Sequence, residues 1–154
     1  MQAISTGNGP SFNSSVLRTV TEDLGRRKFT LESITDTVVL FRKDEQYIKF
    51  TLKDGNLYTR IGVGHPDRGE DIKSMRLDEL IGFNYSGLKR GLIKTENRGV
   101  RECLAMAVRD LWEFAGDFMN GDFRAFFRIA ALKYRDEHGM LRENVILGTE
   151  KKPA

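Results

Sequence analysis

The chain has 154 residues, of which 40% are hydrophobic and 31% are charged, and its net charge is +3. These values are typical of one globular domain with a core of its own. No apolar run approaches the roughly 20 residues of a membrane-spanning helix, and Cys103, the only cysteine, excludes an internal disulfide and a cysteine-built zinc site. We therefore expect a cytoplasmic protein with neither a metal nor a cofactor.

The first 13 residues contain neither a basic region nor an apolar stretch, so they do not form a secretory signal, and we expect a flexible arm there. Apolar residues at helical spacing predict a short helix over 14–25. The sequence predicts a single domain over 14–147 and a flexible tail over 148–154, where core residues are lacking.

The middle of the chain has the pattern of an antiparallel meander. Apolar residues alternate with more polar ones over 47–52 and again over 57–63, which is typical of half-buried strands. Asp54 and Gly55 lie between them and accept the positive φ angles of a tight hairpin. The unbroken apolar run 38–41 predicts a strand that is covered on both faces.

Two shorter segments, 29–34 and 72–76, are candidates for further strands, which gives a meander of three to five. Residues 77–83 have the pattern of a short helix. The segment 84–99 is mostly polar and contains three glycines. We interpret it as a long loop, and loops of this length are often functional.

Two apolar stripes at helical spacing follow, one between residues 96 and 119 and a phenylalanine-rich one over 123–139. Asp122 is a good N-cap for the second helix. Because the connection between them is short, we expect an antiparallel helix pair. The predicted fold class is α+β: an N-terminal helix, an antiparallel meander of three to five strands, and a C-terminal antiparallel helix pair packed on the sheet.

The sequence contains no catalytic constellation. His65, in a predicted loop, is the best candidate for acid–base chemistry, but no cysteine or serine accompanies it at a recognised spacing. Cys103 lies beside an apolar stripe and has the pattern of a buried, inert thiol. We predict a protein that is not an enzyme. The alternative is a small-molecule-binding domain or enzyme that uses His65 and a pocket between sheet and helices.

One basic cluster, within residues 89–101, indicates binding, and Glu96 is the only acidic residue in that segment. Its members are Lys89, Arg90, Lys94, Arg98 and Arg101. A solvated basic loop is the simplest explanation, and the functional one is a contact surface for an acidic partner protein. Nucleic-acid binding through this cluster and residues 26–28 is an alternative, although no aromatic residue interleaves the basic positions.

The hairpin segment 41–50 (FRKDEQYIKF) is followed by 77–80 (LDEL) and by a helix pair joined through 120–123 (NGDF). This layout is similar to that of the small bacterial immunity or immunity-like proteins of toxin systems. The resemblance implies a stoichiometric binder that blocks a cognate toxin inside the producing cell, and no site residue is carried over from it. Because an inhibitor that plugs a nuclease cleft would preferably be acidic, the basic charge predicts a target that is not a nuclease, or one that is blocked away from its nucleic-acid channel.

Overall fold

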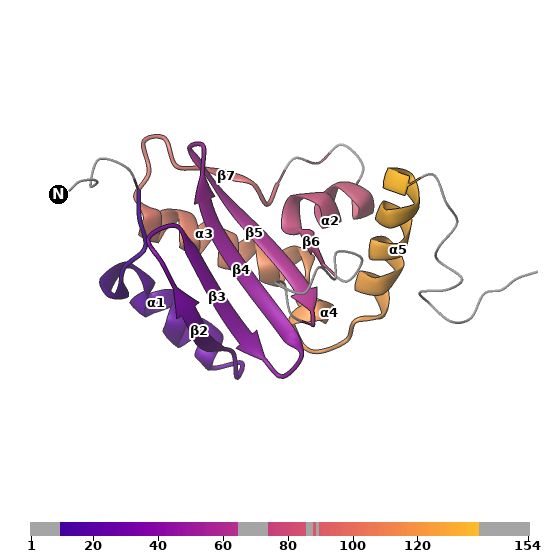
Figure 1. The fold of residues 1–154 in the computed structure, drawn as a ribbon, viewed down its shortest axis with the longest axis horizontal. Coiled ribbons are helices and arrows are strands. Elements are labelled where there is room, and N and C mark those ends of the chain that lie inside the picture. The colour runs from indigo at the N-terminus through magenta and orange to yellow at the C-terminus, as the bar shows by residue number, and fades with distance from the viewer. Residues whose placement is uncertain (1–9, 65–73, 86–87, 89, 139–154) are drawn as a thin grey trace, which may run out of the picture.

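The computed structural model describes residues 10–64, 74–85, 88 and 90–138, and the side chains of these residues as far as 132. It forms one antiparallel sheet whose open face is turned to the viewer in Figure 1, with α1 and α3 behind it and the other helices at one end. The elements are α1 (Ser14–Gly25), β2 (Thr30–Ile34), β3 (Val38–Lys43), β4 (Gln46–Lys53), β5 (Asn56–Val63), β6 (Ser74–Arg76), α2 (Leu77–Asn84), β7 (Ile93–Lys94), α3 (Val100–Phe114), α4 (Gly116–Met119) and α5 (Arg124–His138).

The sheet confirms the predicted meander. The strand order is β2-β3-β4-β5-β6, and every pairing is antiparallel. Both candidate edge segments join it, as β2 and β6. The β4–β5 hairpin turns at Asp54 and Gly55, whose φ angles of 54° and 76° have the sign that such a turn requires.

One face of the sheet carries the core. Across neighbouring strands Phe41 lies opposite Ile48, and Ile48 lies opposite Ile61, and all three are fully buried. Val38 and Leu40 alternate with the buried residues of β3 and point to the open face, where they are only half-buried. The prediction that 38–41 is covered on both faces therefore holds only in part.

The C-terminal helices pack on the sheet as predicted, but three helices form instead of two. The stripe between 96 and 119 is interrupted at Ala115, whose φ of −129° and ψ of 31° are not helical. The last helix, α5, packs against α2 and α4. Figure 1 shows it running across the direction of α3, so the two long helices do not lie along one another.

Two short segments are more ordered than the sequence indicated. Phe12, in the predicted arm, is buried in the core, and its N–H donates to the Asp36 carbonyl at 2.7 Å. In the predicted loop 84–99, Ile93 is buried and begins the strand β7, which pairs with β5. Residues 1–9 and the predicted tail 148–154 lie outside the described residues.

Candidate protein-binding groove

The structure separates the predicted basic cluster into two parts, and Arg90 belongs to the first. Its guanidinium donates to Asp110 at 2.6 Å, approaches Glu113 at 3.5 Å, and lies 5.0 Å from the centre of the Phe114 ring. The Asp110 side chain is only 5% exposed, so its charge requires a partner. Arg90 therefore holds the loop against α3. Lys89 lies outside the described residues.

The other three basic residues gather where α3 begins. Arg98 donates to the carbonyl of Lys94 at 3.1 Å, and both side chains are exposed. Arg101 donates to the Ser15 carbonyl at 3.3 Å and approaches its hydroxyl at 3.4 Å. Since Ser15 belongs to α1, Arg101 ties the first turn of α3 to that of α1.

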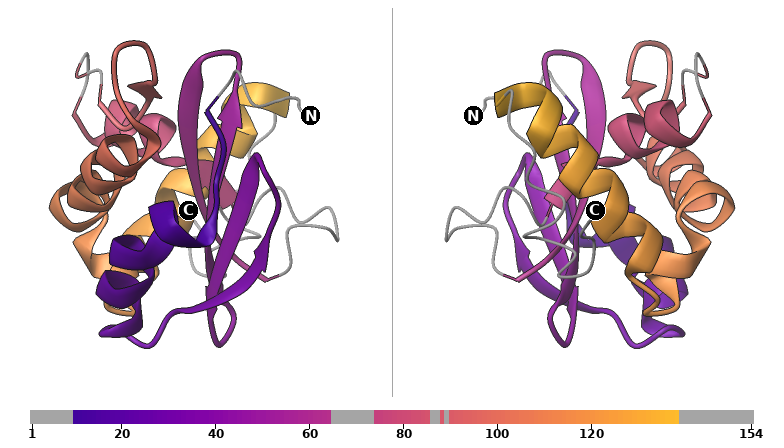
Figure 2. Two further views of the ribbon diagram at one scale, coloured as in Figure 1. Left: turned by 90° about the vertical axis from the view of Figure 1, so that its left-hand side faces the viewer. Right: turned by 90° about the vertical axis from the view of Figure 1, so that its right-hand side faces the viewer.

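Arg101 also stands at one end of a groove that the sequence did not predict. A hollow of about 780 Å³ lies between α1 and α3, the two helices that cover the back of the sheet (Figure 2). We call it the α1–α3 groove. Its apolar lining consists of Val16, Val20, Leu104, Ala105, Val108 and Trp112.

The groove follows from the side chains along the two helices. In α1 the residues that point to the core are Leu17, Val20 and Leu24, whereas Thr19 is exposed. On α3 the corresponding exposed position is Ala105. Because these two side chains are short, they leave the neighbouring valines and Leu104 at the bottom of an open trough.

The charged residues of the groove lining are two arginines, Arg101 and Arg109, and two acidic residues, Asp23 and Glu102. Asp23 lies 3.9 Å from Arg26, which offsets its charge. Within the described part of the chain no carboxylate pairs with Arg101 or Arg109, and Glu102 is the other acidic residue of the lining. An acidic partner would therefore gain from these arginines both attraction and a preferred orientation.

Trp112 forms part of the apolar lining, and it is partly buried against the core. The guanidinium carbon of Arg27 lies 4.6 Å from the centre of its ring, a distance at which a cation and an aromatic face attract. Tryptophan and arginine are enriched among the residues that dominate the affinity of protein interfaces. The pair gives the groove a preorganised anchor.

The sequence singled out two residues for possible chemistry, Cys103 and His65. Cys103 is buried, and burial raises the pKa of its thiol, which agrees with the predicted inert cysteine. His65 lies outside the described residues. A smaller hollow, of about 290 Å³, has Glu113, Asp117 and Asp122 in its lining. Among the described residues no three metal-ligating side chains converge.

No known protein family, curated protein or solved structure matches this chain. In the part that the structure describes, none of the helices has the length and apolar character needed to cross a membrane.

The sequence indicated the basic residues at one end of the groove but not the groove itself. Arg98 and Arg101 stood out because charged residues cluster there in the chain. The two helices are about eighty residues apart in the sequence, and no local pattern indicates that they lie side by side. The exposed Ala105 and Thr19 were the available signal, but small residues on exposed helix positions are common.

Proposed function

We propose that the protein is a non-enzymatic binding module whose α1–α3 groove receives a helix of an acidic partner protein. The observation that carries the proposal is the combination of an apolar trough with two rim arginines, Arg101 and Arg109, that no carboxylate of the described residues pairs with. Interfaces of specific complexes have this anatomy, with an apolar core surrounded by polar residues.

A helix suits the groove because the groove has helical walls. Recognition of this kind places the apolar residues i, i+3, i+4 and i+7 of a partner helix into a trough. The 12 residues of α1 provide a contact of about three helical turns. Acidic residues beside the partner's apolar stripe would then lie near Arg101 and Arg109.

The resemblance to immunity proteins supports a specific kind of partner, a toxin that the module neutralises inside the producing cell. A groove flanked by the unpaired arginines 101 and 109, in a protein of net positive charge, does not complement the positive cleft in which a nuclease holds phosphates. The proposed target is accordingly a toxin of another class, or a nuclease held away from its nucleic-acid channel.

The experiment is affinity purification of three tagged forms from the native cells, with mass spectrometry of the retained proteins. Ala105→Glu places a carboxylate on the exposed face of α3, four residues from both Arg101 and Arg109. The longer side chain fills the trough, and its charge offsets that of the two arginines. At this spacing the substitution is compatible with the helix. Arg128→Gln, on the exposed side of α5, changes the net charge by the same amount.

We expect the wild type and Arg128→Gln to retain one stoichiometric protein that Ala105→Glu loses. Equal retention of that protein by all three forms would place the contact elsewhere. Retention of nucleic acid alone would contradict the proposed partner class.

A further inference from the structure

The open face of the sheet carries a row of cations that the groove does not use. Lys49 of β4 lies directly opposite Arg60 of β5, and Arg60 lies directly opposite Arg76 of β6. Neighbouring strands are about 4.8 Å apart, so three positive side chains stand side by side on one face. Like charges in directly opposed positions destabilise a sheet.

Among the described residues, an acidic side chain neutralises the charge of only one member of this row, Arg76. Arg76 donates to both carboxylate oxygens of Asp78 at 3.0 Å. Arg60 donates to the neutral hydroxyl of Ser74 at 3.0 Å. In the described part of the chain no carboxylate pairs with Lys49 or Arg60. The positive charge at these two positions is therefore available to a ligand.

An aromatic ring lies beside the row. Tyr58 lies two residues before Arg60 in β5, on the same face of the sheet, and is half-buried. The centre of its ring is 5.4 Å from the guanidinium carbon of Arg76. A shallow hollow of about 270 Å³ brings Tyr58 together with the three cations, and Lys53 and Asp54 of the hairpin also line it. Among the described residues that line this hollow, Asp54 is the only acidic one.

We infer that this face is a second binding site, for single-stranded nucleic acid, with phosphates on Lys49 and Arg60 and a base against Tyr58. Basic side chains combined with an aromatic stacking partner are what single strands require. A duplex keeps its bases stacked inside and offers Tyr58 no free base. An acidic polypeptide without aromatic side chains would use the cations but would leave the exposed part of the ring without a stacking partner.

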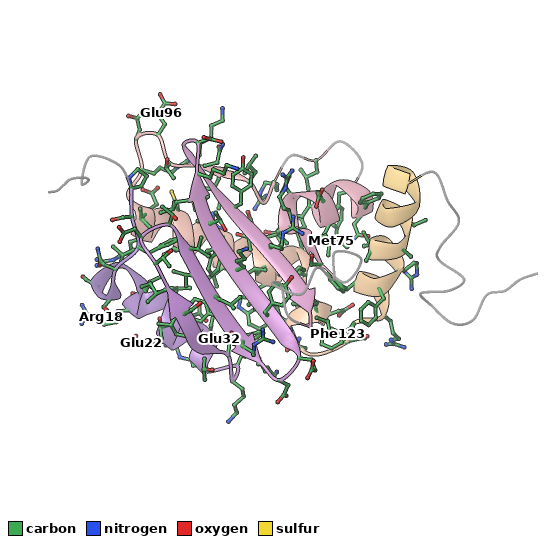
Figure 3. All side chains as sticks on the ribbon, in the orientation of Figure 1. Arg18, Glu22, Glu32, Met75, Glu96 and Phe123 are labelled. Carbon is green, nitrogen blue, oxygen red and sulfur yellow. The ribbon has the colours of Figure 1, made fainter. Side chains whose placement is uncertain are left out.

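The test measures the fluorescence polarisation of short labelled oligo-dT and oligo-U strands with the full chain, from about 50 to 200 mM salt. The double variant Lys49→Gln with Arg60→Gln removes the unpaired charges. Its control, Arg18→Gln with Arg128→Gln, removes two exposed cations from helices instead. Arg18 is on α1, away from the open face (Figure 3). Thermal unfolding of each variant confirms that it is folded.

For the double variant we expect about a tenfold loss of affinity and a slope of log affinity against log salt that is shallower by about 1.4. The control should keep the affinity and slope of the wild type. Tyr58→Leu should lose about tenfold in affinity with an unchanged slope, because stacking releases no counterions.

Three results would overturn the inference. One is the absence of binding at the lowest salt. Another is an equal loss of affinity in the control, which would mean that only the overall charge matters. The third is binding of polyglutamate as tight as that of the oligonucleotides, which would assign the face to acidic polypeptides.

Discussion

The hydroxyl of Thr59 is buried in β5 and, among the described residues, has no hydrogen-bond partner. An unsatisfied buried polar group costs free energy. We predict that Thr59→Val raises the free energy of unfolding by about 1 kcal/mol, measured by urea denaturation. Thr51→Val, on the half-buried open face, makes the same change in β-propensity without removing a buried hydroxyl. An equal gain in both variants would show that propensity alone is responsible.

Gly62 is a position in the sheet at which an added side chain would collide with a neighbouring ring. A Cβ atom there would lie 2.5 Å from the Tyr47 ring, which packs across the backbone of β5. We predict that Gly62→Ala lowers the free energy of unfolding by about 1–3 kcal/mol because the ring must move. Gly82→Ala is the matched control, since a Cβ at that position in α2 meets nothing within 4 Å. A loss of the same size at both positions would contradict the packing argument.

Among the elements, the loop before β7 depends on α3 for its position. Removing Arg90 would leave the buried carboxylate of Asp110 without its charged partner. We predict that Arg90→Ala lowers the thermal unfolding midpoint, whereas Arg98→Ala, whose side chain is exposed, does so much less. Equal midpoints would mean that the contact contributes nothing to stability. A charge reversal that tests the basic loop for binding should therefore leave Arg90 unchanged.

The start of α5 gives a pH prediction. Hydrogen bonds from Arg124 lower the pKa of Asp122 from 3.8 to about 2. Because the folded pKa lies below the unfolded one, this carboxylate stabilises the fold above pH 3.8, and its contribution is lost as the pH falls towards 2. Asp122→Asn should be less stable than the wild type at pH 7, and the difference should disappear near pH 2. A difference that persists there would assign the effect to packing.

The sequence predicted those elements whose pattern is local. The alternation over 47–63 fixed both strands and the hairpin at Asp54, and both edge segments were foreseen. The two-residue strand β7 is too short to show a period, and its pairing with β5 depends on distant residues. The interruption at Ala115 lies within an apolar stripe that continues to Phe118, and its one local mark is Gly116, a residue type common just after a helix end. The ion pair of Arg90 with Asp110 spans 20 residues and is set by the tertiary fold.

Considered as a whole, the molecule has two different surfaces on opposite sides of one sheet (Figure 2). The helix side carries the α1–α3 groove, with an apolar bottom and the arginines 101 and 109. The strand side carries the cation row beside Tyr58. Because the buried face of the sheet separates them, the two proposed sites can be tested independently. Ala105→Glu should leave oligonucleotide binding unchanged, and the Lys49→Gln, Arg60→Gln variant should leave partner retention unchanged.

The most direct test of the proposed function is a photo-crosslink from within the groove. A photoreactive phenylalanine derivative is incorporated at position 102, an exposed acidic position of the groove lining, in one form and at position 128 in another, and each form is irradiated in the native cells. Position 102 is chosen because a bulky side chain at Ala105 would itself fill the trough. We predict that position 102 gives one crosslinked protein, the partner that co-purifies with the wild type, and that position 128 gives none. A partner that co-purifies but crosslinks only from position 128, or from neither, would contradict the account.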